Sequence, residues 1–224
     1  MKTVTIGLVG AGYAAHLHCN GYKKVSGIKV KLKTIVDLDF EKAIEVAKEY
    51  GFKNASSNFN DLLKDEEIDV IDIVTPPALH KEMIIKALNA GKHVICEKPL
   101  TGFFGRESDP TPIGKKVPKS HMYKEVIKDM NEIKEAYMKS GKHLMYAENF
   151  VYAPSIQKTA EIIKSKKSRI LFMKGEESLR GSSSPVAGRW DMTGGGSLIR
   201  IGCHPLTGIL YLKQVEAKAR NAEI

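Results

Sequence analysis

The sequence predicts an α/β protein with a doubly wound parallel sheet. Three observations support this prediction: short β-branched apolar runs alternate with helical segments over residues 1–149, a glycine-rich turn follows the first of these runs, and the pattern changes after about Phe150. Strands that alternate with helices are typical of a parallel sheet covered on both faces. We therefore expect one complete domain over 1–149 and a partial α/β domain over 150–224.

The expected elements of the first domain follow each other in strand–helix order. We expect strands at residues 4–9, 30–36, 69–74, 93–96 and 143–147, and we expect the last of them to complete a six-stranded sheet. We expect helices at residues 14–24, 40–50, 59–64, 78–90 and 123–140. The prolines of Thr75-Pro76-Pro77 end the strand 69–74, because proline cannot continue a central ladder.

The first strand runs directly into Gly10-Ala11-Gly12-Tyr13-Ala14-Ala15, a G-x-G-x-x-A turn that opens a helix. Gly10 allows the tight turn, Gly12 lets a pyrophosphate approach the backbone, and Ala15 lets the helix pack closely on the strand. The free N–H groups at the helix start, those of Tyr13 and Ala14 among them, are expected to bind the phosphates. This order of strand, glycine turn and helix predicts a dinucleotide-binding Rossmann domain.

The second strand ends at Asp37, near the spacing at which an acidic residue binds the adenine ribose hydroxyls. A carboxylate there repels a ribose 2′-phosphate, and no Arg lies beside it, so the sequence favours NAD over NADP. Alternatively, Asp37 or Asp39 only caps the helix 40–50, and of the two we assign the cap to Asp39.

Ligands of doubly wound sheets bind in the crevice at the carboxyl ends of the strands. We expect the residues that end the strands to line the cofactor site at this edge: Gly10, Gly12, Asp37, Thr75, Pro76, Glu97 and Lys98. The polar, proline-rich segment 102–121 interrupts the alternation directly after this edge. A loop of this length is functional or mobile, and we expect a lid, an oligomer arm or a surface insertion.

Beyond residue 150 the sequence predicts a helix at 155–164, a strand at 169–174 and a loop at 178–188. A further helix is expected to begin after Gly194-Gly195-Gly196 and to include both Arg200 and His204.

Composition excludes several classes of function. The net charge of +9 comes from lysines scattered along the chain without interleaved aromatics, which argues against nucleic-acid binding. The three cysteines are far apart, so we expect free thiols in a reducing compartment, and neither an apolar span nor a signal peptide is present. We therefore expect a cytoplasmic protein without membrane contact. No His/Cys group has the spacing of metal ligands, so we expect no metal.

With these landmarks in order, the chain resembles the glucose–fructose oxidoreductase / inositol dehydrogenase / rhizopine catabolism (Gfo/Idh/MocA) family of NAD(P)-dependent oxidoreductases. The resemblance rests on the glycine turn, on Thr75-Pro76-Pro77 with His80, on Glu97-Lys98-Pro99, and on Gly194-Gly195-Gly196 through His204. It implies a Rossmann domain joined to a substrate domain built on an open, largely antiparallel sheet. It also implies a homo-oligomer that forms through that sheet.

The resemblance implies that Lys98 contacts the reacting oxygen of the substrate. An ammonium group there polarises an alcohol and stabilises the developing alkoxide. Pro99 is expected to make the turn rigid, through a cis bond if one is present. Without the surrounding motif, Lys98 would be interpreted as an exposed lysine in a loop.

The family's second motif implies that His204 is the general base, since its ordinary pKa lies near neutral pH. The alternative is a histidine that only hydrogen-bonds within an interface. The family places an aspartate one helical turn earlier, on the same helix face, where this chain has Arg200. Arg200 would suit an anionic group of a sugar acid, uronate or phosphorylated polyol, or it marks a lineage with weakened redox chemistry.

Further expectations concern residues outside these motifs. His80 and Asn149 are expected on the substrate side, with Glu148 beside Asn149 in the family's acidic–asparagine pair. His16 and His18 are expected only to cap or pack the first helix. Family members are usually much longer, so most of the substrate-domain sheet is expected to be absent here. We then expect the chain to be a fragment, a truncated gene product or a protein that pairs with another copy of itself.

The sequence therefore predicts an NAD-dependent oxidoreductase that transfers a hydride between a sugar, polyol, sugar acid or related hydroxyl substrate and nicotinamide. Two alternatives remain. One is an NAD-binding relative without turnover, such as a sensor or an inactive product. The other is a glycosidase or lyase that uses NAD only transiently.

Overall fold

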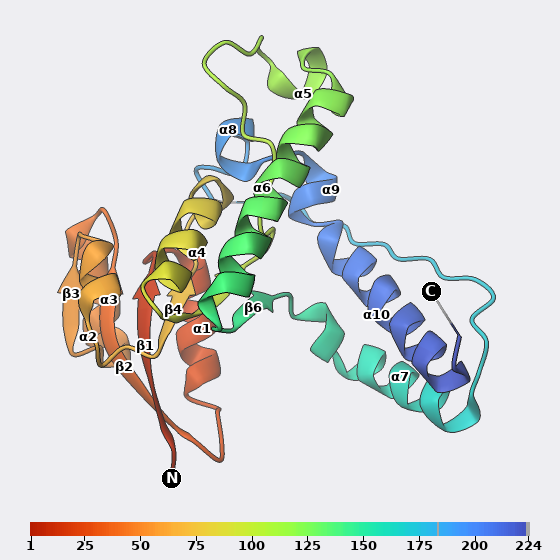
Figure 1. Cartoon of the computed structure of the whole chain (residues 1–224), viewed down its shortest axis with the longest axis horizontal. Coiled ribbons are helices and arrows are strands. Elements are labelled where there is room, and N and C mark those ends of the chain that lie inside the picture. Colours follow the sequence, from red (N-terminus) through yellow and green to blue (C-terminus); the bar gives the residue numbers. More distant parts are fainter. Residues whose placement is uncertain (183, 223–224) are drawn as a thin grey trace.

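The computed structural model describes residues 1–182 and 184–222. A six-stranded sheet with the order β3-β2-β1-β4-β5-β6 forms its first part, and each neighbouring pair is parallel (Figure 1). The strands are β1 (Thr3–Val9), β2 (Lys29–Val36), β3 (Asn54–Ser56), β4 (Val70–Ile73), β5 (His93–Glu97) and β6 (Leu144–Ala147). The strand order reverses between β1 and β4, which confirms the doubly wound Rossmann fold.

Helices connect these strands, and every described element after β6 is a helix. The sheet's helices are α1 (Tyr13–Tyr22), α2 (Phe40–Tyr50), α3 (Asn60–Lys64), α4 (His80–Asn89), α5 (Ile113–Lys116) and α6 (Lys119–Ser140), with the 3-10 turn η1 (Pro77–Leu79). The later elements are η2 (Phe150–Tyr152), α7 (Pro154–Lys166), α8 (Trp190–Thr193), α9 (Ser197–Arg200) and α10 (Cys203–Arg220). Among the described residues, no helix is both long enough and apolar enough to cross a bilayer.

Two apolar layers hold the sheet between its helices. Val9 and Ile73 face a cluster formed with α3, α4 and α6, whereas their neighbours Leu8 and Val74 face a cluster formed with α1 and α2. Successive residues of a strand point to opposite faces, so near-continuous apolar strands are expected when both faces are covered. Burial of these side chains positions the carboxyl ends of the strands at one edge.

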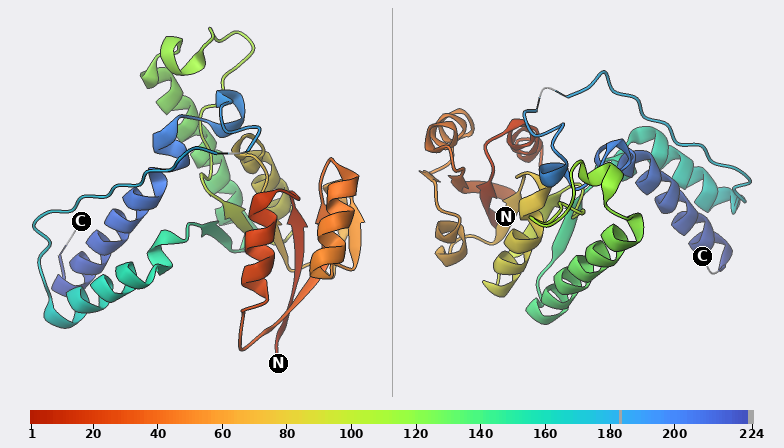
Figure 2. Two further views of the ribbon diagram at one scale, coloured as in Figure 1. Left: turned by 180° about the vertical axis from the view of Figure 1, so that it is seen from behind. Right: turned by 90° about the horizontal axis from the view of Figure 1, so that it is seen from above.

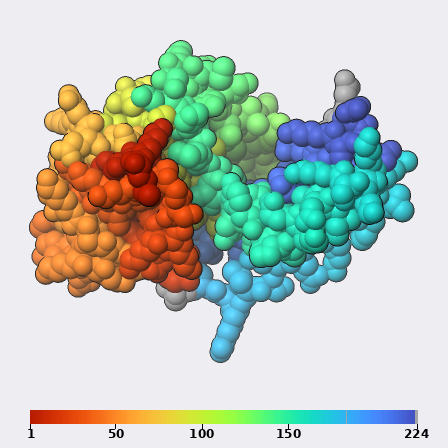
Figure 3. Space-filling view, turned by 90° about the horizontal axis from the view of Figure 1, so that it is seen from below, coloured from red at the N-terminus to blue at the C-terminus, as the bar shows by residue number. Residues whose placement is uncertain are grey.

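The helices α7 and α10 pack against each other as an arm beside the sheet (Figures 1 and 2). Their shared core contains Ala160, Ile163, Leu212 and Val215. Seen from below, α7 forms the near face of this arm and α10 lies behind it (Figure 3). The region after residue 150 is therefore helical where the structure describes it, rather than α/β as expected.

The predicted strand at 169–174 is wrong. The structure assigns no helix or strand to this segment, and no described strand lies beside it. Its inward side chains Ile170 and Met173 pack on the core of the α7–α10 arm, while Leu171 and Phe172 are 90% and 81% exposed. The Ile170 N–H donates to the Glu216 carboxylate at 2.9 Å instead of to a neighbouring strand. The segment is a short apolar run, and helices rather than neighbouring strands cover two of its side chains.

The sixth strand of the sheet is β3, which was not among the five strands named from the sequence. It has three residues and no apolar alternation, so pairing with β2 is its only distinguishing feature. The insertion 102–121 also contains structure: α5 lies within it, and α6 begins at Lys119, four residues before the expected start at Tyr123.

Candidate functional site

The glycine turn after β1 has two different glycine requirements. Gly10 has φ +105°, and a Cβ there would lie 2.9 Å from the carbonyl oxygen of Val74, the residue that follows β4, so the backbone at this position requires a glycine. A Cβ on Gly12 would meet no atom within 4 Å, so packing does not explain that glycine. Gly12 precedes α1, which has no side-chain cap. The open space therefore lies where free helical N–H groups could bind a phosphate.

Asp37 lies against this turn, as its spacing predicted. Its Oδ2 accepts a hydrogen bond from the Ala11 N–H at 2.6 Å, and its Oδ1 accepts one from the Asp39 N–H at 2.9 Å. The cap of α2 belongs to Asp39, whose side chain accepts from the Lys42 N–H. The two aspartates thus have separate positions, and only Asp37 is placed at the glycine turn.

His80 is a structural link, and the expectation that it contacts substrate is wrong. The side chain is fully buried, and its two ring nitrogens lie 2.9 Å from the Pro99 carbonyl oxygen and 2.8 Å from that of Thr75. Burial lowers the pKa of His80, although both carbonyls oppose that effect. The ring therefore lies between the turn after β4 and the turn after β5, with both nitrogens facing backbone carbonyls instead of a substrate.

The Lys98–Pro99 peptide bond is cis, as the sequence allowed. The Lys98 Nζ donates to the backbone carbonyl of Arg200 at 2.8 Å, across 102 residues of chain. This hydrogen bond joins the carboxyl edge of β5 to the end of α9. Lys98 is therefore not a free surface lysine, because its ammonium group is held at the edge where the cofactor site was predicted.

His18 connects the first helix to this edge, a role that the sequence analysis missed. Its Nδ1 lies 2.8 Å from Asp72 Oδ2 and its Nε2 lies 3.1 Å from Glu97 Oε1, while the Tyr22 hydroxyl donates to the same Asp72 oxygen at 2.7 Å. Burial alone would lower the pKa of His18, but hydrogen bonds and charges from Asp72 and Glu97 raise it to about 10. The sequence feature that could have indicated this contact is Asp72, a carboxylate inside an otherwise apolar strand.

Glu97 is turned towards the protein in this structure. One of its oxygens meets His18, and Oε2 accepts from the Lys98 N–H at 2.9 Å. Burial raises the pKa of Glu97, but the His18 hydrogen bond and charge outweigh it and the net direction is downward. Glu97 thus holds the backbone of the residue that carries the ammonium group.

The prediction that Arg200 and His204 share one helix face is wrong. Helix α9 ends at Arg200, Ile201 leaves helical geometry with φ −126°, and α10 begins at Cys203. The Arg200 guanidinium donates to the Ala187 carbonyl at 3.0 Å, whereas only its backbone oxygen meets Lys98. Arg200 therefore does not occupy the place of an acid beside His204.

The acid that lies beside His204 is Glu148. The His204 Nδ1 lies 2.7 Å from Oε1 of Glu148, which follows β6, and the ring stacks on Phe150 with a centroid separation of 4.7 Å. Glu148 is buried, whereas its neighbour Asn149 is exposed at the start of η2. The sequence named Glu148 only as a lesser candidate, since the 56 intervening residues carry no sign of the contact.

The insertion 102–121 packs against the segment that leads to His204. The Phe103 N–H donates to the Gly194 carbonyl at 3.0 Å, and the Trp190 indole N–H donates to the Phe103 carbonyl at 2.8 Å. Phe103, Val117 and Met122 form a small core against Trp190. The insertion thus supports the glycine-rich segment from outside.

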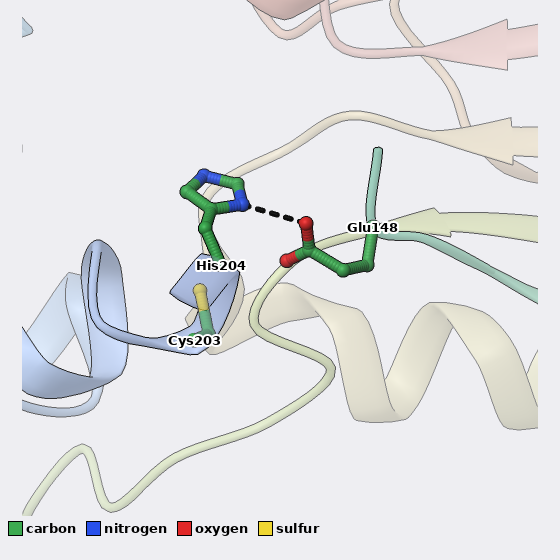
Figure 4. Close-up of side chains that lie close together, drawn as sticks. All are labelled: Glu148, Cys203 and His204. Carbon is green, nitrogen blue, oxygen red and sulfur yellow. Dashed lines mark hydrogen bonds and ion pairs between the residues drawn. The ribbon is translucent and has the colours of Figure 1, made fainter. Parts of the chain in front are cut away.

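Glu148, Cys203 and His204 bring three potential metal-ligand atoms within 4.8 Å of one another, a grouping that sequence spacing did not reveal (Figure 4). All three side chains are already hydrogen-bonded. Glu148 is paired with His204, and the Cys203 Sγ donates to the Arg200 carbonyl at 3.8 Å. The Lys98 ammonium meets the same carbonyl and would repel a cation. We therefore interpret the group as a hydrogen-bonded site.

Comparisons with known proteins identify relatives of the Rossmann domain. The family model described as "Oxidoreductase family, NAD-binding Rossmann fold" (GFO_IDH_MocA) matches residues 4–104. Levoglucosan dehydrogenase of Pseudarthrobacter phenanthrenivorans is 37% identical over 107 residues, which are 45% of this chain and 27% of that protein. A 4-carboxy-2-hydroxymuconate-6-semialdehyde dehydrogenase of a Sphingobium species is 36% identical over 95 residues, 42% of this chain and 30% of that protein.

The fold extends beyond the matched sequence. A solved structure of levoglucosan dehydrogenase in complex with NADH superimposes with a TM-score of 0.72 and 24% identity, covering 94% of this chain and 54% of that one. The chain thus spans about half the length of that structure. By the matched region, residues 4–104 belong to the NAD-binding Rossmann domain of the Gfo/Idh/MocA family of oxidoreductases, and the fold of the described chain is that of the solved structure.

Proposed function

We propose that this protein is an NAD-dependent oxidoreductase that transfers a hydride between a hydroxyl group of a sugar or polyol and nicotinamide. The observation that carries the proposal is the meeting of Lys98 with the segment 200–204 at the carboxyl edge of the sheet. An ammonium group and an imidazole are thereby held at the edge where Gly12 leaves room for a dinucleotide.

The residues present suit NAD. The open space at Gly12 and the uncapped start of α1 suit the pyrophosphate. The carboxylate of Asp37 suits the ribose. Bound NAD supplies the hydride acceptor. The Asp37 carboxylate repels a 2′-phosphate, so NAD is preferred to NADP.

Two side chains would act on the substrate. The Lys98 ammonium polarises the reacting oxygen and stabilises the alkoxide that develops when the hydride leaves. His204 removes the hydroxyl proton, because an imidazole accepts a proton near neutral pH. Glu97 and the Arg200 carbonyl hold Lys98 from its two ends, at the main-chain N–H and at Nζ.

A neutral sugar or polyol suits the site better than a sugar acid. The Arg200 guanidinium donates to Ala187 and so does not present its charge beside Lys98 and His204. The relative that shares 37% identity over 107 residues is named for a sugar substrate, levoglucosan. Both observations favour an uncharged carbohydrate.

A second candidate is a relative that binds NAD without turnover. The substitution of arginine for the family's aspartate at position 200 favours it. The two functions are separated by measuring NADH binding by calorimetry and NADH formation from NAD with a panel of sugars, polyols and sugar acids. Binding with turnover supports the oxidoreductase, and tight binding without turnover on any member supports the second candidate. Failure to bind NAD or NADP contradicts both.

A further inference from the structure

We propose that Glu148 is the positioning residue of His204: its buried carboxylate fixes which ring nitrogen carries the proton and stabilises the imidazolium formed during catalysis. The inference rests on the proposed function for its catalytic consequence, but the state of the His204 ring can be tested without any turnover. The residue directly after β6 then supplies the acid that the sequence motif lacks at position 200.

The geometry holds the ring from two sides. Glu148 Oε1 lies 2.7 Å from His204 Nδ1 and also accepts the Phe150 N–H at 3.0 Å. The Phe150 ring lies almost parallel to the imidazole, with an interplanar angle of 18°. The carboxylate is thus fixed by the backbone that follows it, and the imidazole is fixed by the carboxylate and by stacking.

Burial makes this contact important to both partners. The Glu148 side chain is 2% exposed, and its Oε2 is buried without a hydrogen-bond partner among the described residues. A buried carboxylate is costly unless a charge or a donor compensates it. Burial raises the pKa of the neighbouring Cys203 thiol, which keeps that side chain neutral, so it adds no second negative charge beside Glu148. His204 is the titratable donor that compensates Glu148.

An ionised carboxylate accepts hydrogen bonds and cannot donate them. The proton of a neutral His204 ring must therefore lie on Nδ1, which leaves the lone pair on Nε2. Figure 4 shows the second ring nitrogen directed away from Glu148. Glu148 thus selects the tautomer in which the nitrogen directed away from it is the proton acceptor.

The proton balance follows from this tautomer. The carbinol C–H bond breaks with its electron pair, which passes to nicotinamide as hydride, while the hydroxyl proton passes to His204 Nε2 and the carbonyl bond forms. The ring is then an imidazolium, and its Nδ1–H faces a carboxylate of opposite charge. Because this ion pair exists only after proton transfer begins, the interaction lowers the barrier rather than strengthening substrate binding.

The structural arm of the test is a nitrogen-15 NMR measurement of the His204 ring in the full chain without nucleotide. The inference predicts the Nδ1–H tautomer in the wild type and predominantly the Nε2–H tautomer in Glu148→Ala, with His80 as an internal reference. An Nε2–H tautomer in the wild type would overturn it. The wild-type measurement decides the matter even if the Ala variant does not fold.

The kinetic arm compares Glu148→Gln with Glu135→Gln, a matched loss of one carboxylate at an exposed position of α6. We expect kcat to fall about 10- to 100-fold in Glu148→Gln with KM nearly unchanged, no change in Glu135→Gln, and partial recovery in Glu148→Asp. Equal kcat values in the two Gln variants would contradict the inference, and so would loss of wild-type activity on adding a chelator, which indicates a metal centre. A wild type with the predicted tautomer but no turnover refutes the proposed function alone.

Discussion

Stability should fall steeply with rising pH because of the charged group at His18. The ordinary pKa of 6.5 is raised to about 10 in the folded protein, where Asp72 and Glu97 outweigh the effect of burial. The folded state therefore holds this proton more tightly than the unfolded state does. The stabilisation is fully present below pH 6.5 and is lost as the pH rises towards 10.

The magnitude follows from linkage. Between the two pKa values, each pH unit removes about 1.4 kcal/mol from the free energy of unfolding. Between pH 7 and pH 9 the expected loss is about 3 kcal/mol, a large part of the stability of an ordinary domain. The His18 side chain is only 15% exposed, so solvent screens this interaction weakly.

The assay is urea unfolding at several pH values from 7 to 9. This window lies below most of the titration of the buried Cys19, whose pKa burial raises to about 12 and whose unfolded form ionises near 9. His18→Gln keeps the size and polarity of the side chain but has no charge to lose. We expect a steep slope in the wild type and a shallow one in the variant. Equal slopes would refute the assignment of a charged His18.

Three further predictions concern the cofactor edge. Gly10→Ala should lower the free energy of unfolding by about 2 kcal/mol or more, because φ is +105° and the new Cβ would lie 2.9 Å from a carbonyl oxygen. Gly12→Ala should instead change stability by less than about 1 kcal/mol and weaken NADH binding. Thermal unfolding measures the stability and calorimetry the binding, and equal destabilisation by the two variants would contradict the different roles given to the two glycines. Asp37→Ser should raise the affinity for NADP relative to NAD, measured by parallel titrations, and an unchanged ratio would remove its role at the ribose. Lys98→Ala should leave NADH affinity nearly intact and lower kcat by at least about 100-fold, and a variant that keeps its kcat would exclude Lys98 from the chemistry.

Local patterns were sufficient for the Rossmann domain. The turn at Gly10, the apolar strands and the glycine that ends α6 at Gly141 each depend on a few adjacent residues, and the structure confirms the order of elements that they predict. The cap by Asp39 was predictable for the same reason. In contrast, β3 has too few residues for a pattern, and only its neighbour β2 makes it a strand.

The site depended on contacts that are distant in the chain. The hydrogen bond between Lys98 and the Arg200 carbonyl crosses 102 residues, and no spacing rule predicts it. The break at Ile201 separates two segments whose sequence reads as one helix, so the expected partnership of Arg200 with His204 was lost. The contact of Glu148 with His204 arises only because α10 returns to the end of β6.

The apolar run at 169–174 shows a different limit. A short apolar run indicates that side chains are buried, but it does not say whether a sheet or a pair of helices buries them. Ile170 and Met173 are covered by α7 and α10, and no strand is assigned to the segment. The prediction of buried apolar side chains was correct for these two residues, and the prediction of a strand was wrong.

The most direct test of the central claim is the formation of NADH by the purified chain with NAD and a panel of neutral sugars and polyols. We predict that NADH accumulates with at least one of these substrates and that Lys98→Ala, with an intact NADH affinity, forms none. A wild-type protein that binds NADH tightly but reduces no NAD with any member of the panel would contradict the proposed oxidoreductase activity.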